Sequence, residues 1–404
     1  MARILYLTQV LPYPLSTGAR VRQYYVLRYL SQKHEVTLVS FVRPDDKVEH
    51  VEHLRTFCSA IYTVPMQRAR WRDARAVLKG LVTGEPFVIA RDEIATMQQT
   101  LARLMASERF EAVHADQIAM AQYGLMGRQH GLRTVLDLHN AMYLVTQRLA
   151  DNEPNPLKRL LSKRETRALA KYEAKICEKY DQVVFVTDED RAAIESQIDR
   201  YNIRIPSGRF TTIPICADPT DKLPIAPVAQ PHRVTALGVM FWPPNAEGVL
   251  WFARDIWPKI QTQFPSVRLT VVGKNPPSEL QALNGHSHIE VTGFVPDVKQ
   301  ILAETAVFIV PLRAGGGMRV KILDTWCWGL PIVSTSIGAE GIRICNGENI
   351  LIADTVDDLA RAVTSVLSDP QFAQRLRQNG RKWIEDNYDW RVVYSAWDKV
   401  YANL

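Results

Sequence analysis

Short apolar runs alternate with longer amphipathic stretches through the first half of the chain. Runs of this kind predict strands, and the stretches between them predict helices such as Gly18–Lys33. The expected strands are Arg3–Thr8, His34–Phe41, Ala112–Ala115, Arg133–His139 and Gln182–Thr187. Since parallel strands need crossover connections, the pattern predicts βαβ units whose sheet is covered by helices on both faces.

A second series with the same pattern follows in the second half. Its expected strands are Arg233–Gly238, Val267–Gly273, Ile289–Val295, Ala306–Leu312 and Leu330–Thr335, with helices over Asn245–Ile260 and Pro296–Ala306. The prediction is therefore an α/β protein with two Rossmann-like doubly wound domains. Such folds bind ligands outside the carboxyl ends of their strands, so we expect substrates in a cleft between two facing domains.

The domain boundaries follow from composition. Leu223–Arg233 contains three prolines and little periodicity, which is typical of a linker. We expect an N-terminal acceptor-side domain over 1–222, the linker over 223–233, a C-terminal domain over 234–385 and a terminal helix over 386–404. The apolar spacing of Asp389–Leu404 predicts that this last segment is one amphipathic helix.

Composition fits a soluble globular protein. Of 404 residues, 47% are hydrophobic and 23% charged, and no apolar run reaches the roughly 18 residues of a membrane span. The N-terminus lacks the cleavage site of a signal peptide. The five cysteines are widely spaced and include no CxxC pair. This pattern indicates reduced thiols in a cytoplasmic protein and does not have the spacing of a zinc site.

Positive charge is concentrated in the first half of the chain. Residues 1–200 hold 29 Lys and Arg against 24 Asp and Glu, whereas residues 251–404 hold 16 of each. The stretch Leu157–Tyr180 has eight basic and three acidic residues beside an apolar stripe. A basic amphipathic helix can lie on an anionic membrane, which predicts peripheral attachment to the inner face; a solvated helix packed on its own domain is the alternative.

The segment "AGGGMRVKILDTWCWGLP", Ala314–Pro331, has the most specific chemistry. A buried strand ends in three glycines, Gly315–Gly317, and a helix begins directly after them. Glycines let the backbone approach an anion, and the free N–H groups of a helix start attract it. Arg319 and Lys321 add charge at this point, and Asp324 one turn later could reach a ribose hydroxyl pair. The alternative is a turn followed by a structural Lys–Asp pair.

Two further points lie at ends of expected strands in the first domain. Gly18 stands at a strand-to-helix junction with Arg20 and Arg22 in the first helical turn, where cations oppose the helix dipole. Such a conflict between local preference and position often marks function, although a turn glycine with surface arginines is the simpler interpretation. Asp116 and His139 end two other strands, where residues that contact a ligand would lie.

Other classes of site and partner are disfavoured. The sequence contains no P-loop, GxGxxG, HExxH, EF-hand or Gly-x-Ser-x-Gly motif. Nucleic-acid binding is not expected, because the basic residues are not interleaved with aromatics in a known module pattern.

Three segments together resemble GT-B glycosyltransferases, in particular the retaining, family-4 type of the glycosyl transferases group 1. "PYPLSTGARVRQYYVLRYLSQKHEVTLVSF" is similar to the acceptor-domain opening of that family. "TTIPICAD" resembles its IPNGVD segment, with Ile215 and Cys216 in place of Asn and Gly. "VTGFVPDVKQILAETAVFIVPLRAGGGMRVKILDTWCWGLPIVSTSIGAEGI" resembles the donor-domain core, in the subgroup with a GGG-x-R-x-K motif.

The resemblance implies roles and also shows departures. The second acid of the family's Glu-x7-Glu pair aligns with Asp324, but the first aligns with Gly316, which has no side chain. The first donor-domain loop, which begins at Gly238, lacks the family's Arg and Lys, and Arg319 and Lys321 are the obvious replacements. His139 matches the active-site histidine.

The expected reaction is transfer of a sugar, with retention, from a nucleotide-diphosphate sugar to a saccharide or lipid-linked acceptor in exopolysaccharide or cell-envelope assembly. The nucleotide base is expected against the backbone near Phe294 and Val295, and no metal or other cofactor is expected. Three alternatives remain: a nucleotide-sugar epimerase, a phosphorylase holding pyridoxal phosphate, and a degenerate GT-B protein without catalysis.

Overall fold

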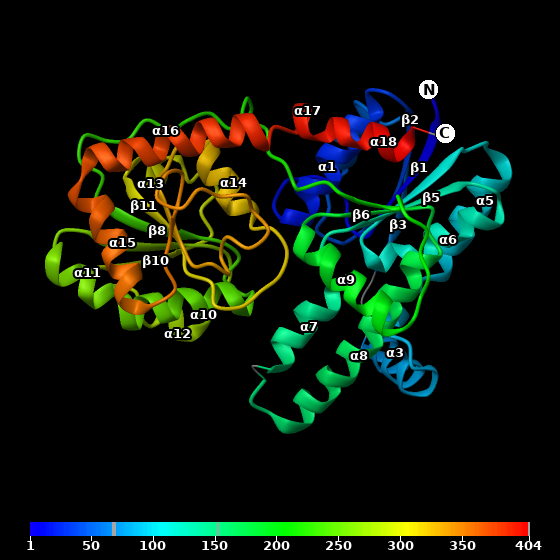
Figure 1. Cartoon of the computed structure of the whole chain (residues 1–404), viewed down its shortest axis with the longest axis horizontal. Coiled ribbons are helices and arrows are strands. Elements are labelled where there is room, and N and C mark those ends of the chain that lie inside the picture. The colour runs from blue at the N-terminus through cyan, green and yellow to red at the C-terminus, as the bar shows by residue number, and fades with distance from the viewer. Residues whose placement is uncertain (67–69, 152, 403–404) are drawn as a thin grey trace. The chain divides into compact units, whose positions relative to one another are not determined.

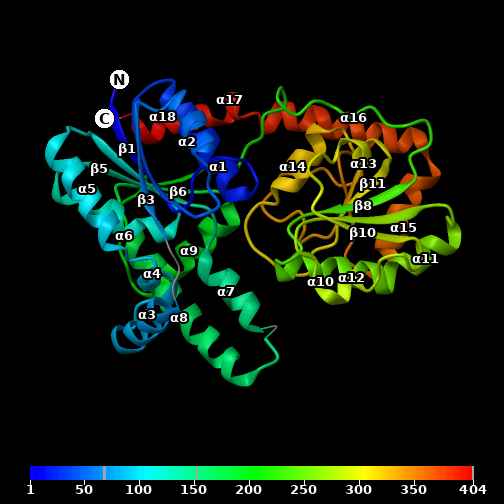
Figure 2. The ribbon, with the colours of Figure 1, turned by 180° about the vertical axis from the view of Figure 1, so that it is seen from behind.

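The computed structural model describes residues 1–66, 70–151 and 153–402. Its contacts divide the chain into two compact units. Unit 1 comprises Met1–Cys216 together with Trp390–Leu404, and unit 2 comprises Ala217–Asp389. Figures 1 and 2 show both units as a sheet with helices packed against it.

The sheet of unit 1 is parallel throughout the part of the chain that is described. Its strands follow the order β3-β2-β1-β4-β5-β6-β7. They are β1 (Arg3–Thr8), β2 (Glu35–Val42), β3 (Ala60–Pro65), β4 (Ala112–Asp116), β5 (Arg133–Leu138), β6 (Gln182–Phe185) and β7 (Phe210–Thr212). Reversal of the strand order on either side of β1 is the doubly wound arrangement predicted from the sequence.

Helices connect these strands and cover the sheet. They are α1 (Gly18–Ser31), α2 (Val48–Arg55), α3 (Arg70–Thr83), α4 (Phe87–Arg91), α5 (Ala95–Ser107), α6 (Ala121–Gln129), α7 (Met142–Asp151), α8 (Pro156–Glu178) and α9 (Asp188–Arg200), with a 3₁₀ turn over Ile118–Met120. The apolar sides of β1, β4 and β5 form one core with α5 and α6. Figures 1 and 2 show α7 and α8 running side by side away from this sheet.

Unit 2 repeats the architecture with a six-stranded parallel sheet among the described residues. The order β10-β9-β8-β11-β12-β13 again reverses, here on either side of β8. The strands are β8 (Arg233–Leu237), β9 (Arg268–Val272), β10 (Ile289–Gly293), β11 (Thr305–Val310), β12 (Ile332–Ser334) and β13 (Leu351–Ile352). The fold is therefore two Rossmann-like α/β units, as in GT-B proteins, and this prediction is confirmed.

The helices of unit 2 include one long composite helix. The predicted helix Asn245–Ile260 consists of α10 (Pro243–Trp251), a π-helical turn (Phe252–Ile256) and α11 (Trp257–Gln263). The other helices are α12 (Ser278–Gln281), α13 (Lys299–Ala303), α14 (Val320–Cys327), α15 (Val356–Ser368) and α16 (Pro370–Asn387).

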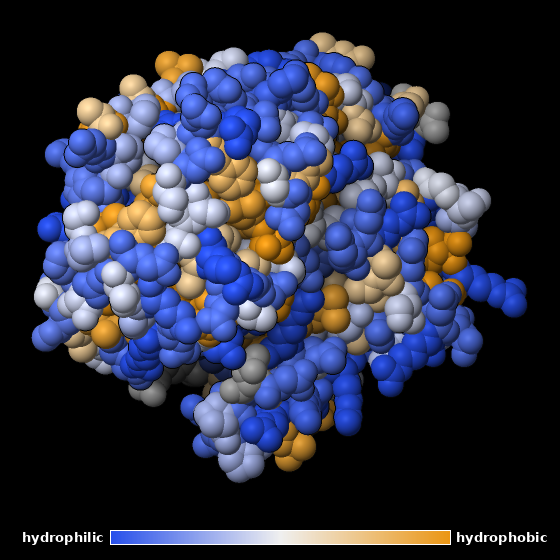
Figure 3. All heavy atoms as spheres, turned by 60° about the vertical axis from the view of Figure 1, so that its left-hand side comes forward, coloured by the Kyte–Doolittle hydropathy of each residue, from blue (hydrophilic) through white to orange (hydrophobic). Residues whose placement is uncertain are grey.

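On the face of the molecule shown in Figure 3, hydrophilic residues predominate and hydrophobic ones form small groups between them.

Residues 217–232 are packed against unit 2, whereas the sequence predicted a linker between the two domains over 223–233. The backbone N–H of Ile225 donates to Trp328 O at 2.9 Å, and that of Val228 donates to Ala303 O at 3.0 Å. The guanidinium of Arg381 donates to Pro219 O at 2.8 Å. These bonds tie the segment to unit 2 along its length, so the boundary lies at Cys216–Ala217.

The C-terminal segment belongs to unit 1 but is not the single helix that its periodicity predicts. It is broken into α17 (Trp390–Val393), a 3₁₀ turn (Tyr394–Ala396) and α18 (Trp397–Tyr401), and residues 403–404 lie outside the described chain. The aromatic side chains of Trp390, Tyr394, Trp397 and Tyr401 are all buried. The 3₁₀ turn has about three residues per turn, so it interrupts the regular α-helix between the two short helices.

None of the helices in the described residues combines the length and the apolar composition needed to cross a bilayer.

Candidate functional site

Unit 1 brings His139 and Asp116 into contact at the carboxyl ends of adjacent strands. β4 and β5 pair in parallel with Asp116 opposite Asp137, and His139 follows β5 directly. His139 Nε2 lies 2.9 Å from Asp116 Oδ1, and His139 is only 8% exposed. The fully buried Asp116 also accepts a hydrogen bond from Gln23 Nε2 at 2.5 Å. Two candidates predicted from separate strand ends therefore form one hydrogen-bonded group.

Gln117, which the sequence analysis did not single out, lies next to this pair in a rare backbone conformation. Its φ is 71° and its ψ 157°, a region that side chains disfavour. Its Nε2 lies 3.4 Å from His139 Nδ1. Strained residues of this kind concentrate at functional sites, because the surrounding structure must hold them in place. Gln117 joins His139 and Asp116 in the candidate site of unit 1.

The two arginines at the start of α1 have different surroundings. Gly18 is the first residue of the helix, and the Thr17 hydroxyl accepts from the backbone N–H of Arg20 at 3.4 Å. The side chain of Arg20 pairs with Asp46 at 2.9 Å. Neither contact involves His139 or Asp116, so the structure does not bring Gly18 or Arg20 together with the other candidates of unit 1.

The contacts of Arg22 explain why a cation stands at the start of α1, where the helix dipole disfavours it. Its guanidinium is fully buried and grips Asp137, with Nε 2.8 Å from Oδ2 and NH2 2.7 Å from Oδ1. Its NH1 donates to Ile213 O at 2.8 Å. Burial alone would lower the pKa of Arg22, but the Asp137 carboxylate raises it above its ordinary value. Arg22 thus joins α1, β5 and the end of β7 beneath the candidate site.

His114, Asp116 and Asp137 also satisfy the spacing of a metal site, since one ligand atom from each lies within 4.8 Å of the others. The chemistry of the group fits a cation poorly. Asp137 already has the Arg22 guanidinium as its counter-ion, and His114 Nδ1 lies 2.7 Å from Tyr401 Oη. Burial lowers the pKa of His114 to about 3, so the ring is neutral and the positive charge beside Asp137 comes from Arg22. The arrangement is a polar network around Arg22.

The loop that carries His139 is held by two buried acids. Glu173 on α8 accepts hydrogen bonds from the backbone N–H groups of Met142 (2.7 Å) and Tyr143 (2.9 Å). Asp190 accepts from the N–H of Ala141 at 2.8 Å. Burial raises the pKa of Glu173 to about 8, although the two N–H groups act in the opposite direction. These contacts fix the backbone immediately after His139.

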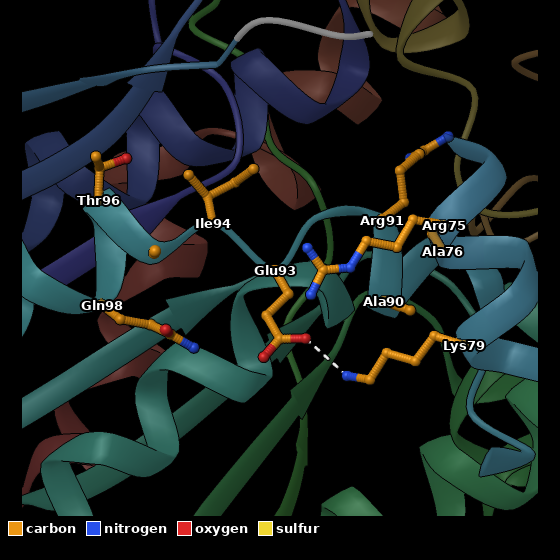
Figure 4. A pocket seen from close by; sticks show the side chains of 10 residues that line it. Arg75, Ala76, Lys79, Ala90, Arg91, Glu93, Ile94, Thr96 and Gln98 are labelled. Carbon is orange, nitrogen blue, oxygen red and sulfur yellow. Dashed lines mark hydrogen bonds and ion pairs between the residues drawn. The ribbon is translucent and has the colours of Figure 1, made fainter. Parts of the chain in front are cut away.

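A separate cavity of about 460 Å³ opens between α3, α4 and α5. Figure 4 shows Lys79 pointing toward Glu93 across it, an ion pair of 2.7 Å. Arg91, which also lines the cavity, pairs with Asp92 at 3.1 Å. Its lining contains neither His139 nor Asp116, so it is distinct from the candidate site of unit 1.

In unit 2, the glycine-rich loop connects β11 to α14 as predicted. Gly315 and Gly317 have φ values of 137° and 70°, which favour glycine, and Arg319 is the extended residue directly before the helix. The Arg319 guanidinium folds back and donates to the carbonyl oxygens of Gly316 and Gly317. Arg319 therefore lies against the loop, at the start of α14, where the helix offers unpaired N–H groups.

Lys321 connects this loop with the loop after β8. Its Nζ donates to Asn245 Oδ1 at 3.0 Å, and Asn245 Nδ2 donates to Val239 O at 2.9 Å. A Cβ on Gly238 would lie only 2.8 Å from Lys321 Nζ, so the glycine leaves room for the ammonium. Burial and the nearby charge of Arg319 lower the pKa of Lys321 to about 8. Asn245 is a site residue that the sequence analysis missed.

Asp324, one turn along α14, pairs with Lys222. Both side chains are about one-fifth exposed. Lys222 comes from the segment 217–232 of unit 2, whereas the sequence predicted it as the last residue of the N-terminal domain, so this partner was missed. The expected contact of Asp324 with a ribose stays a prediction. It requires the carboxylate either to bind the ribose and Lys222 together or to give up its ion pair with Lys222.

Exposed aromatic rings follow the ends of β10 and β8, the two strands that flank β9 in the same sheet. Phe294, directly after β10, is 69% exposed, whereas Val295 is half-buried. Phe241 and Trp242, in the loop after β8, are also exposed. The candidate site of unit 2 therefore joins cations and glycines after β8 and β11 with apolar rings at the same edge of the sheet.

Two family models match this chain. The glycosyl transferase 4-like domain matches residues 17–208, and the glycosyl transferases group 1 domain matches residues 231–369. Together they span most of both units.

Two relatives with curated descriptions are similar to this chain in sequence. A Klebsiella pneumoniae protein described as an uncharacterized 44.6 kDa protein in the cps region is 23% identical over 98% of this chain and 99% of its own. A GDP-mannose-dependent phosphatidylinositol monomannoside mannosyltransferase of Mycolicibacterium smegmatis is 28% identical over 33% of this chain and 39% of its own.

Solved structures show the same fold at low identity. Sucrose-phosphate synthase from Thermosynechococcus elongatus matches with a TM-score of 0.68 and 16% identity, covering 99% of this chain and 98% of the other. Anabaena HepE, solved in complex with UDP and glucose, matches with a TM-score of 0.67 and 13% identity over the whole of both chains. With its two family domains and its two parallel-sheet units, the chain belongs to the GT-B glycosyltransferases and is a transferase.

Proposed function

We propose that this glycosyltransferase moves a sugar from a nucleotide-diphosphate sugar to an acceptor hydroxyl and retains the anomeric configuration. The observation that carries the proposal is the glycine-rich loop of unit 2, with Arg319 at the start of α14 and Lys321 within its first turn. Two cations and a helix start are suited to bind a diphosphate. The complex of Anabaena HepE with UDP and glucose supports a donor of this class.

In the proposed reaction, the bond between the anomeric carbon and the β-phosphate oxygen breaks as the acceptor oxygen bonds to the same carbon. Negative charge develops on the β-phosphate, and the acceptor proton passes to that phosphate oxygen. Arg319, Lys321 and the amides of Gly315–Gly317 stabilise this charge, an electrostatic effect that commonly dominates catalysis. No step requires a metal, because these groups supply the positive charge.

Unit 1 is proposed to bind the acceptor through the candidate site around His139. Asp116 holds one ring nitrogen of His139 and Gln117 faces the other, so the imidazole is held in one orientation. An imidazole fixed in this way is suited to orient a sugar or acceptor hydroxyl by hydrogen bonding. Base contacts are proposed near Phe294 and Val295, and Asp324 is proposed to bind the ribose.

The acceptor is proposed to be a saccharide or lipid-linked saccharide of exopolysaccharide or cell-envelope assembly. The relative from the Klebsiella cps region, which matches over nearly the whole chain, supports this assignment. A cytoplasmic, membrane-peripheral location is part of the same proposal.

A panel of nucleotide sugars, assayed for hydrolysis and for transfer, tests the function. We expect one or a few donors to be consumed, and nuclear magnetic resonance of the product to show the anomeric configuration of the donor. Donor conversion to an isomer without any acceptor would instead identify an epimerase. Absence of both binding and turnover across the panel would support a protein without catalysis.

A further inference from the structure

The outer ends of α3 and α8 in unit 1 expose an unusual number of large apolar side chains. On α8, Leu157 and Leu160 are each 66% exposed and Leu161 is 50% exposed. On α3, Leu78, Leu81 and Val82 are exposed as well. Single exposed leucines need no explanation, but a group of this kind marks an interaction surface.

The apolar residues of α8 share one side of the helix with its cations. At 100° per residue, Leu157, Leu160 and Leu161 fall within a sector that also contains Arg164, Arg167 and Lys171. The opposite sector packs inward through Leu169, Ile176 and Cys177, which are buried. The helix therefore presents leucines near its start and cations further along on one outward face.

The acids of α8 offset only part of this charge, since Glu165 pairs with Arg164 at 3.7 Å. Glu165 accepts from the backbone N–H groups of Phe87 (2.9 Å) and Val88 (3.2 Å), and Glu173 holds the start of α7. Glu178 is the last residue of the helix. The outward sector keeps the charges of Arg167, Lys171 and Lys175. In all, α8 carries seven basic residues: Lys158, Arg159, Lys163, Arg164, Arg167, Lys171 and Lys175.

α3 continues the same surface. Arg164 on α8 donates to the carbonyl oxygen of Gly80 near the end of α3, so the two helices are in contact. Along α3, Arg75, Leu78, Lys79 and Val82 follow the spacing of one helical face. Lys79 is paired with Glu93 and Glu85, and the exposed Arg75 lines the same cavity as Lys79. Cations and exposed apolar groups thus alternate on both helices.

From this combination we infer that the face formed by α3 and α8 docks on an anionic phospholipid bilayer. The exposed leucines and valine would enter the boundary between headgroups and acyl chains, while the cations would remain at the lipid phosphates. Charge selects this occupant: a second copy of the chain would bring an equally basic face, whereas an anionic bilayer attracts it. The inference rests on unit 1 alone and does not depend on the identity of the sugar donor.

Co-sedimentation of the full chain with vesicles tests the inference. One set of vesicles contains phosphatidylcholine alone and the other contains phosphatidylcholine with phosphatidylglycerol. We expect binding to the second set only, and release as salt is raised. Since each cation near such a surface contributes about fivefold to partitioning, K163E/R167E should weaken binding by at least about thirtyfold. L160S/L161S should weaken it by roughly tenfold or more.

Matched variants separate this surface from general effects. Val48→Ser changes an exposed apolar residue on α2, and R361E/K382E reverses two exposed cations of unit 2; both should bind vesicles like the unchanged chain. Thermal unfolding shows whether each variant is folded. The salt dependence of vesicle binding is measured on the unchanged chain, so that result does not depend on the folding of any variant. Equal binding to both vesicle sets, unaltered binding of the α8 variants, or a dimer that these variants dissociate would overturn the inference.

Discussion

The ammonium of Lys321 donates to the side-chain oxygen of Asn245 at 3.0 Å and thereby links α14 and α10, the helices that follow the loops after β11 and β8. Both loops leave the carboxyl edge of the unit 2 sheet, where a doubly wound fold binds its ligand. The family's cations are missing from the loop after β8, and Lys321 reaches that loop from α14 instead. We propose that Lys321 supplies the positive charge that the loop after β8 lacks.

Replacement of Lys321 should lower the rate of transfer without lowering the stability of the folded protein. In Lys321→Met we expect transfer to fall by roughly 10²–10³-fold, the effect of removing one group that stabilises developing charge. The folded protein should become no less stable, because burial opposes the charged lysine. Initial rates at saturating donor and thermal unfolding of the same sample measure the two effects. Loss of stability together with normal turnover would contradict this role.

The pH dependence of activity should report Lys321. Since its pKa is lowered to about 8, the ammonium loses its proton as pH rises through that value, and activity should fall there. The folded state then binds fewer protons than the unfolded state between pH 8 and the ordinary pKa of lysine, so this group adds stability as pH rises through that window. Lys321→Arg should move the alkaline limb of the rate profile upward. An unchanged limb would assign it to another group.

Breaking the buried pair of Arg22 and Asp137 should cost much more than breaking a surface pair. Asp137→Asn leaves the Arg22 guanidinium buried without its counter-ion, which typically costs about 3–5 kcal/mol. As a control, Arg55→Ala removes an exposed pair with Glu52 and should cost at most about 1 kcal/mol. Urea unfolding compares the two. Similar costs for both would show that the Arg22 network does not stabilise unit 1.

Glu173 should make unit 1 less stable as pH rises. Its pKa in the folded protein is raised to about 8, so the folded state keeps a proton that the unfolded chain loses near the ordinary value. Stability from this group is complete below the unfolded pKa and declines between there and pH 8, by an amount on the order of a few kcal/mol. Glu173→Gln should remove this part of the decline, measured as the difference in unfolding free energy between the two proteins at pH 5 and pH 8. Equal declines in both would refute it.

The same variant tests whether Glu173 positions His139. Above pH 8, where Glu173 is ionised and can accept with both oxygens, a glutamine accepts with only one, so the loop Ala141–Tyr143 should be held less firmly. We expect acceptor transfer to fall while donor hydrolysis changes little, because the loop lies in unit 1. His139→Ala should show the same division more strongly. A parallel loss of hydrolysis and transfer would assign these residues a different role.

Sequence pattern predicted both sheets because parallel strands that are buried on both faces are nearly continuous apolar runs, as in β1, β5 and β11. It missed β3, β7 and β13, whose side chains are partly exposed and whose pattern is weaker. The glycine-rich loop and its two cations could be recognised in the sequence because these residues are close neighbours along the chain. Asn245 and Lys222 were not, since their partners Lys321 and Asp324 are distant in sequence. The backbone strain of Gln117 has no signal in composition.

Calorimetric titration of the full chain with UDP- and GDP-sugars tests the central claim most directly. For a donor that the chain accepts, we predict saturable binding that weakens at least about tenfold in Arg319→Ala and in Lys321→Met, since each removes a charged contact to the diphosphate. Asp137→Asn, provided that it remains folded, should bind the donor normally, because its change lies in unit 1. Donor binding that is unaffected by both unit 2 substitutions would contradict the account.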